Sequence, residues 1–253
     1  MQVMHSLYRG GRLFAGLMLW LFVSLVQAAS LSVNPVIITL SSSDSIAAMT
    51  LTNNGSDEVV MQASVNAWSI RDNEEHYAAT TALIVSPPVF QVAPGKSQIV
   101  RIGLSDTAPQ GVEQSFRVFL EQAPATPGDE RAADAAARGP RGVQMMLRLG
   151  IPVFVKAAGV STSKLVWQAK RLANGRLQIT AENQGNAHTK ISRLMLMDKD
   201  KVIATAEQLS YLLPGSRRHW VLDVPAGTAA PYRIKAEAKD GVLETTITHS
   251  SAP

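Results

Sequence analysis

The chain of 253 residues contains no cysteine, so it can form no disulfide, thiolate zinc site or thiol nucleophile. Aromatic residues make up only 6% of it, and its formal net charge is +4. Because that charge is small and no basic stripe with interleaved aromatics accompanies it, a nucleic-acid partner is disfavoured. We therefore expect a fold held together by apolar cores alone.

Long hydrophobic runs are also lacking, apart from one at the N-terminus. There, Arg9 and Arg12 precede an apolar stretch over residues 13–26 and a small-residue cleavage pattern, which is typical of a secretory signal peptide. The run is about 14 residues, short of the ~20 that a membrane span needs, although an uncleaved anchor is the alternative interpretation. We predict a signal peptide over residues 1–28, export, and no membrane span in the mature chain. Cleavage leaves 225 residues (253 − 28) and a charge of +2, since both arginines leave.

Motifs for catalysis and cofactor binding are absent from the sequence. It has no nucleophile elbow, phosphate loop or dinucleotide glycine fingerprint. Asp72, Glu74 and Glu75 flank Asn73 and indicate a solvated turn rather than a catalytic carboxylate pair. The histidines show no metal-ligand spacing, and we interpret them as ordinary surface residues: His5, His76, His188, His219 and His249. We expect no enzymatic activity, no cofactor and no metal.

What the sequence does contain is a long series of β-strand patterns. Segments rich in Val, Ile, Thr and Leu recur roughly every ten residues between turn residues, which is typical of β-sandwiches. The predicted strands of the first half are 32–40, 47–53, 59–70, 82–85, 98–104, 116–120 and 143–155. Those of the second half are 165–168, 176–183, 187–197, 202–209, 218–222, 232–238 and 243–249. We predict an all-β chain of two tandem sandwiches, 29–156 and 157–253, with a hinge at Ala157-Ala158-Gly159.

The strand over residues 143–155 is the most informative stretch. Its odd-numbered positions are apolar from Val143 to Ile151, while the even-numbered ones are smaller or more polar. Side chains alternate between the two faces of a strand, so the apolar set forms one continuous row. Residues 121–142 before it are rich in Pro, Gly and Ala, and indicate a long loop, with a short helix over 130–138 as the alternative. The residues alone leave two interpretations open: an interior strand, or an edge strand whose apolar row is lent to a partner.

Several motifs together resemble one family, the PapD-like periplasmic pilus chaperones of the chaperone–usher pathway. The most specific is Pro-Pro-x5-Pro-Gly-x5-Arg from Pro87 to Arg101. The others are Leu31–Ile37, Met49–Asn54, Ala67-Trp68, Phe116–Leu120, Ile151–Val155 and Trp167. The resemblance implies two immunoglobulin-like domains in a boomerang arrangement, a periplasmic location, and pilus subunits and an outer-membrane usher as partners. It spans most of the first half and is weaker in the second.

The resemblance also implies a mechanism and a set of site residues. A pilus subunit lacks one strand of its own sandwich, and the chaperone lends a strand that completes it. Aligned through the Ile151–Val155 motif, the lent residues are Val143, Met145, Leu147 and Leu149. The alternative is that these four residues fill the core of their own domain. An uncovered apolar edge also favours a self-capping dimer of the free chaperone.

The sequence departs from the family at the anchor for the subunit's C-terminus. Typical members hold that carboxylate with two basic residues, but Ile37 and Pro152 occupy the matching positions. This departure resembles the divergent branch that assembles archaic or alternate-type pili. We hypothesise that Arg148, with Arg101 and Arg117, replaces the pair, because a guanidinium binds a carboxylate through two parallel hydrogen bonds.

Two rival functions remain open at this point. A pilus subunit or adhesin would show one incomplete sandwich and a free N-terminal extension, whereas this chain has two strand-complete halves. A secreted sugar- or peptide-binding module would expose aromatic residues on one face. Trp68 and Trp167 occupy positions that indicate core, which leaves Trp220 and some tyrosines for such a face.

Overall fold

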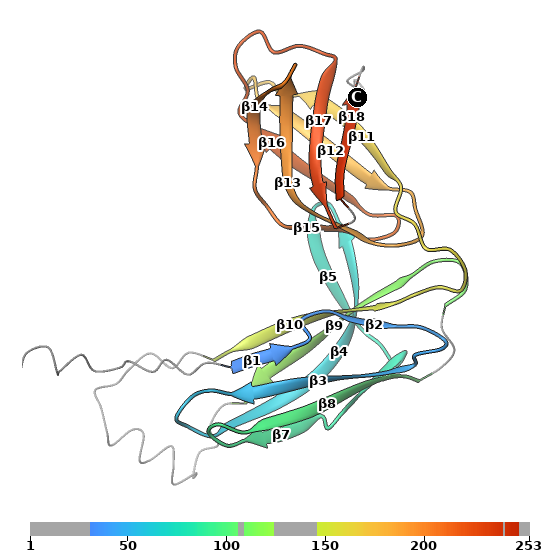
Figure 1. Cartoon of the computed structure of the whole chain (residues 1–253), viewed down its shortest axis with the longest axis vertical. Helices are drawn as coiled ribbons and strands as arrows, with labels where there is room; N and C mark the ends of the chain where they lie inside the picture. The colour runs from blue at the N-terminus through green and yellow to red at the C-terminus, as the bar shows by residue number, and fades with distance from the viewer. Residues whose placement is uncertain (1–30, 106–108, 124–145, 240, 248–253) are drawn as a thin grey trace, which may run out of the picture.

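The computed structural model describes residues 31–105, 109–123, 146–239 and 241–247. These form two β-sandwiches that meet at an angle, in a boomerang outline, and no α-helix occurs in the described ranges (Figure 1). The predicted all-β, two-domain fold is thereby confirmed. No helix within these ranges is long and apolar enough to cross a membrane. The predicted signal peptide lies outside the described residues.

The first sandwich packs a four-stranded sheet against a six-stranded sheet. In spatial order, the smaller sheet contains β1 (Leu31–Asn34), β3 (Ile46–Asn53), β8 (Ser97–Leu104) and β6 (Leu83–Ser86). The larger sheet contains β2 (Ile38–Leu40), β10 (Arg148–Val155), β9 (Gln114–Gln122), β4 (Val59–Arg71) and β5 (Glu74–Ala79), with β7 (Val89–Val92) paired to β4.

The alternating sequence pattern explains how these two sheets close on one core. Phe116, Val118 and Leu120 of β9 are buried in the core, as are Val100 and Ile102 of β8 from the opposite sheet. The residues between them point to the opposite face of their sheet, where Phe119 is nonetheless buried, because successive side chains of a strand point to opposite faces.

The chain changes sheets between β1 and β2, where one continuous strand over residues 32–40 was predicted. That prediction is wrong because Pro35 has no N–H to donate and the ladder stops at Asn34. As a result β1 pairs with β3 in one sheet, while β2 pairs in parallel with the end of β10 in the other.

The second sandwich has a three-stranded and a five-stranded sheet. The first contains β11 (Leu165–Arg171), β12 (Leu177–Asn183) and β16 (Arg217–Leu222). The second contains β14 (Lys201–Ala206), β13 (Thr189–Asp198), β17 (Tyr232–Ala238) and β18 (Gly241–Ile247), with β15 (Ser210–Leu212) paired to β13. Trp220 is only 3% exposed and stacks with Trp167, so it offers no aromatic face to a sugar or peptide.

Both domains contain the same buried asparagine corner. Asn53 donates its side-chain N–H groups to the carbonyl of Val92 (2.9 Å) and to a carbonyl four residues along the chain. Asn183 does the same with Leu212 (3.0 Å) and with a carbonyl four residues along. In each case the side-chain oxygen accepts the N–H of the glycine two residues later. This internal repeat ties the end of a strand to a distant Pro-Gly turn in both sandwiches.

Candidate functional site: a free strand edge and the interdomain cleft

The β10 strand has one edge that is only partly paired. Its inner edge pairs with β9 over the whole strand, from Arg148 to Val155. Its outer edge pairs with β2 only over residues 153–155. Within the described ranges, no strand pairs with the outer edge of residues 148–152. The backbone N–H and C=O groups of this edge form a template on which another strand can pair.

Of the four predicted donor residues, the structure describes two, because Val143 and Met145 lie outside the described residues. Leu147 is 37% exposed just before β10, and its carbonyl accepts a hydrogen bond from the Gln122 N–H. Leu149 is partly buried against the core of its own domain. Leu147 is therefore available to a partner, whereas Leu149 is shared with its own sandwich.

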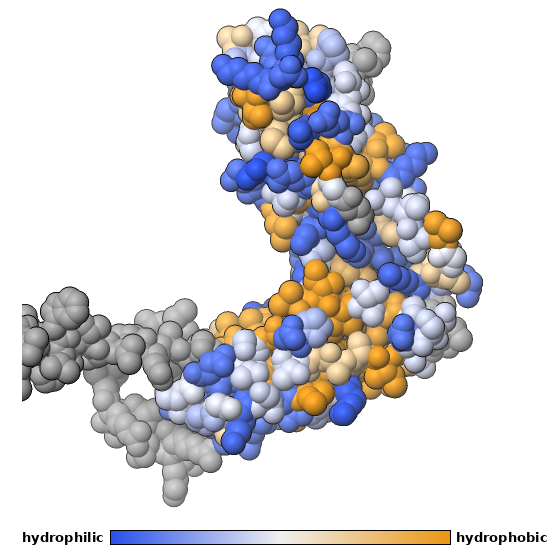
Figure 2. Space-filling view, viewed as in Figure 1, coloured by the Kyte–Doolittle hydropathy of each residue, from blue (hydrophilic) through white to orange (hydrophobic). Residues whose placement is uncertain are grey.

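Further apolar side chains lie near this edge. Val36 and Ile37, in the connection between β1 and β2, are 64% and 38% exposed, and Met146 is 63% exposed. Figure 2 shows hydrophobic surface on this side of the N-terminal domain. Exposed apolar groups beside an open strand edge are typical of an interaction surface.

The three arginines proposed as anchors do not lie together. Arg148 is exposed, with its guanidinium 2.7 Å from Glu121 and 4.0 Å from the centre of the Phe119 ring. Arg101 lies in β8 of the opposite sheet and points outward. The structure thus places Arg101 across the sandwich from Arg148 and Arg117.

Arg117 lies in the interdomain cleft, directly opposite Pro152 on the neighbouring strand. Its guanidinium lies 4.0 Å from the centre of a Trp68 ring and 2.9 Å from the Glu75 carboxylate. The side chain is only 11% exposed. Arg117 is therefore engaged by groups of its own domain rather than open to an incoming anion.

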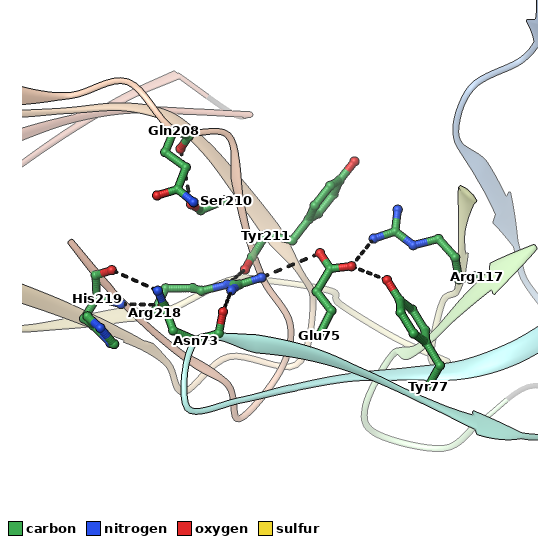
Figure 3. Close-up of polar contacts among 9 residues, drawn as sticks. All are labelled: Asn73, Glu75, Tyr77, Arg117, Gln208, Ser210, Tyr211, Arg218 and His219. Carbon is green, nitrogen blue, oxygen red and sulfur yellow. Dashed lines mark hydrogen bonds and ion pairs between the residues drawn. The ribbon is translucent and has the colours of Figure 1, made fainter. Parts of the chain in front are cut away.

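A polar network joins the β4–β5 hairpin to the second domain (Figure 3). The Glu75 carboxylate accepts from Arg117 and Tyr77 and lies 3.6 Å from Arg218 of the second domain. At the hairpin turn, the Asn73 side chain accepts from the His219 backbone N–H (3.0 Å), and the Asn73 carbonyl accepts from Arg218. The predicted solvated turn is thus an interdomain contact.

Burial shifts the pKa values of three groups in this network. It raises the pKa of Tyr77, with the hydrogen bond to Glu75 adding to the rise. It also raises the pKa of Tyr211, an effect that Arg117 opposes. Burial lowers the pKa of Arg218, and the nearby Glu75 opposes that change.

We expect this network to lose stability in alkali. The folded state holds the tyrosine protons more tightly than the unfolded chain, so unfolding becomes easier as the pH rises from about 10 through the raised pKa values. Urea unfolding between pH 8 and pH 11 measures this. Tyr77→Phe removes one of the ionising groups and should flatten the decline; an equally steep decline would contradict the assignment.

A pocket of about 400 Å³, lined by residues of both domains and of the linker, lies beside the end of β10. Lys156, which follows β10, and Lys239, which follows β17, both line it. The other lining residues are Thr39, Glu113, Ser161, Thr162, Ser163, Ala187 and His188. With two ammonium groups and several hydroxyls, this pocket suits an anion. Lys156 was not predicted as a site residue, although it lies four residues past Pro152, an even spacing that places both on the same face of an extended strand.

His188 is buried in this region, which corrects the interpretation of the histidines as surface residues. Its Nδ1 lies 2.7 Å from the Glu113 carboxylate, and both side chains are under 10% exposed. Within the described ranges, no group of three or more His, Asp or Glu side chains is arranged to hold a metal.

Solved structures with this fold are pilus chaperones and their complexes. A chain from the CsuC–CsuE chaperone–tip subunit complex of the archaic Csu pili of Acinetobacter baumannii matches 88% of this chain and 100% of its own length, at 19% identity and a TM-score of 0.65. A chain of the Salmonella enterica SafA pilin–SafB chaperone complex matches 87% and 98%, at 14% identity and a TM-score of 0.59. The Escherichia coli chaperone DraB matches 88% and 97%, at 19% identity and a TM-score of 0.56.

These identities are low, so the structural likenesses establish the fold alone. No curated protein sequence matches the chain. The family model for the N-terminal domain of PapD, described as a pili and flagellar-assembly chaperone, matches residues 30–161, just over half of the chain. The chain therefore belongs to the PapD family of pilus-assembly chaperones.

Proposed function

We propose that this protein is a periplasmic chaperone that captures incomplete pilus subunits by donor-strand complementation and delivers them to an outer-membrane usher. Membership of the PapD family supports the proposal, as do the related structures in which a chaperone is bound to a pilin or tip subunit. The observation that carries it is the unpaired outer edge of β10 over residues 148–152. We expect the usher to receive the loaded chaperone, as in the family generally.

The unpaired main-chain groups and apolar side chains of this edge can complete a subunit that lacks a strand. Main-chain hydrogen bonds along the edge contribute affinity, and alternate side chains filling the subunit's groove contribute specificity. Burying one leucine side chain is worth about 1.5–3 kcal/mol, so the predicted row Val143, Met145, Leu147 and Leu149 offers several times that before ordering costs. Ile151 and the residues after it fill their own core, which makes β10 a strand shared between two proteins.

Hydrogen exchange tests the proposal. When a pilus subunit without its own donor strand is supplied, we expect protection to rise at the outward-facing amides of residues 146–151. The β18 strand, an edge strand of the second domain, serves as the internal control and should not change. A stable one-to-one complex without new protection along β10 would contradict the donor-strand role. If the chaperone is recovered without any bound subunit, the proposed function itself is contradicted.

We also propose a place for the subunit's C-terminal carboxylate. A subunit strand that pairs in parallel with the free edge of β10 runs from residue 146 to residue 152, where β2 takes over the edge, and its last residues must pass β2 to bring the C-terminus to the pocket lined by Lys156 and Lys239. Of the three arginines suggested by the sequence, Arg148 alone is both exposed and on the donor strand. Arg148 therefore remains the second candidate for this anchor.

Replacing Lys156 tests the pocket. Lys156→Gln removes one ammonium group, and we expect subunit affinity to fall by about tenfold, the worth of one charge-assisted hydrogen bond. Lys170 of β11 is also an exposed lysine, so Lys170→Gln is the matched control and should have no effect. Binding titrations with purified subunit measure both. Equal subunit affinities of the two variants would show that Lys156 does not bind the subunit's carboxylate. Arg148→Gln would then be the next variant to compare.

A further inference from the structure

The second domain has a pocket of about 290 Å³ that is separate from the interdomain cleft. It is lined by the end of β13, by β14, by the start of β17 and by the loop over residues 225–231 that precedes β17. These segments meet at the end of the domain that points away from the first domain (Figure 1). A ligand bound there would therefore leave the donor edge of β10 free.

The lining of this pocket combines apolar side chains with oxygen atoms. Its aliphatic surface comes from Leu196, Ile203, Pro225 and Pro231. Its polar side chains are those of Asp198, Thr228 and Tyr232, and all three carry oxygen atoms only. Among the lining residues that the structure describes, none is Lys, Arg or His. The pocket therefore suits a ligand with a short apolar body and a group that donates hydrogen bonds.

Two of these polar groups have no partner within the described ranges. Tyr232 is only 7% exposed, yet its hydroxyl makes no hydrogen bond to a described residue, although buried tyrosine hydroxyls usually have one. That oxygen is not sealed from solvent either, so it opens to the pocket that Tyr232 lines. Asp198 is exposed and has no ion-pair partner among the described residues, whereas the nearby Asp200 lies 3.4 Å from Arg233. An unpaired carboxylate and an unpaired hydroxyl thus line the same pocket.

The loop that borders the pocket is held by bonds of the protein itself. The Thr228 backbone N–H and hydroxyl both donate to the Pro225 carbonyl, at 3.2 Å and 2.8 Å. Arg171 of β11 donates to the Thr228 carbonyl. Gly227 has a φ of +81°, which allows the tight turn between Pro225 and Thr228. Because the loop is already held in place, binding requires little further ordering of it.

We propose that this pocket binds a primary ammonium group on a short aliphatic chain. An ammonium group has three donors and no acceptor, so it matches the oxygen atoms of Asp198 and Tyr232. The aliphatic chain lies against the apolar lining around Leu196. Free alkylamines and the lysine side chains of other proteins share this chemistry. The proposal does not depend on the chaperone function, because the residues that line the pocket take no part in the proposed subunit capture.

A titration of the whole protein, followed by its backbone amide NMR signals, tests the proposal. The probes are butylammonium, butanol and butyrate, which share a chain length and differ in charge. We expect butylammonium to give saturable shifts at residues 196–198 and 226–230. Butanol should bind about fivefold more weakly, which is the upper end for an exposed ion pair, and butyrate should not bind. A capped lysine amide tests the second source of the ammonium group, and the amine that binds more tightly identifies the source.

Two single substitutions locate the site. Asp198→Asn removes the carboxylate and should weaken butylammonium binding about fivefold. Tyr232→Phe keeps the buried ring and removes only the hydroxyl, so this variant should fold and also bind about fivefold more weakly. Asp223→Asn is the matched control, because Asp223 is another exposed carboxylate of the second domain and lies outside the pocket.

Three results would overturn the proposal. They are shifts that do not saturate, equal binding of butylammonium and butanol, and equal effects of Asp198→Asn and Asp223→Asn, which would indicate a general attraction to acidic surface. Subunit affinity should be the same for Asp198→Asn and for the wild-type protein. If the wild-type protein captures no subunit, the chaperone function fails, while the amine titration still shows whether the pocket binds its ligand.

Discussion

Replacing Leu147 by aspartate should abolish subunit capture while leaving the free chaperone folded. Leu147 is 37% exposed, lies just before β10 and, unlike Leu149, is not among the side chains packed against the core of its domain, so the substitution removes no core packing. Exposed substitutions of this kind change the free energy of unfolding by about 0.5 kcal/mol or less. In a complex the leucine enters an apolar groove, where its burial is worth about 1.5–3 kcal/mol, and a carboxylate there adds a further desolvation cost. We expect affinity to fall more than a hundredfold.

Co-purification with a pilus subunit and a titration with purified components measure this effect. Val202→Asp is the matched control, because Val202 is a similarly exposed apolar residue on β14 of the second domain. Circular dichroism of the free variants verifies that both remain folded. If Leu147→Asp recovers as much complex as Val202→Asp does, Leu147 is not inserted into the subunit.

Much of the fold could be predicted from local patterns. Strands such as β12 and β17 bury every second residue over most of their length, and their turns contain Gly, Pro, Asn or Asp, so their positions follow from the sequence. The β5 strand was missed because every residue of Glu74–Ala79 is exposed and no alternation marks it. This hairpin leaves its own sandwich to meet the second domain, so its structure depends on a distant partner rather than on a local apolar period.

The candidate site was predictable in part. The donor edge follows from the alternation around Leu147 together with the family resemblance. The sequence could not show that Arg101 and Arg148 lie in different sheets. The alternation of side chains along a strand indicates which residues share a face, but not which sheet the strand joins. Glu75 and His188 were taken for surface residues, since their partners Arg218 and Glu113 are distant in sequence and only the domain arrangement brings them together.

The repeated asparagine corner was also overlooked, although both copies follow an Asn-x-Gly pattern. In each domain the asparagine ends a strand and the glycine two residues later donates to its side chain: Asn53 with Gly55, and Asn183 with Gly185. In the sequence, each motif resembles an ordinary polar turn. The difference is burial, since Asn53 is 1% exposed and Asn183 is fully buried.

Asn183→Ala should therefore destabilise the second domain strongly. The side chain of Asn183 donates to the Leu212 carbonyl and a second carbonyl, and accepts from the N–H groups of Gly185 and Lys164. Each buried group left without a partner costs about 1–3 kcal/mol, so we expect a loss of about 4 kcal/mol in the free energy of unfolding. Lys164 belongs to the linker before β11, so the link between the domains should loosen as well.

Urea unfolding followed by tryptophan fluorescence measures this loss, because Trp167 and Trp220 both lie in the second domain. Asn183→Asp keeps the acceptor oxygen but replaces the amide nitrogen by a second carboxylate oxygen that faces the two carbonyls, so its loss should be at least as large as that of the alanine variant. Asn174→Ala, in an exposed turn, controls for asparagine replacement in general and should cost about 0.5 kcal/mol or less. Asn53→Ala should reproduce most of this effect in the first domain, because Asn53 makes the counterparts of three of these four bonds. Equal stabilities of Asn183→Ala and Asn174→Ala would show that the corner contributes no more than a surface turn.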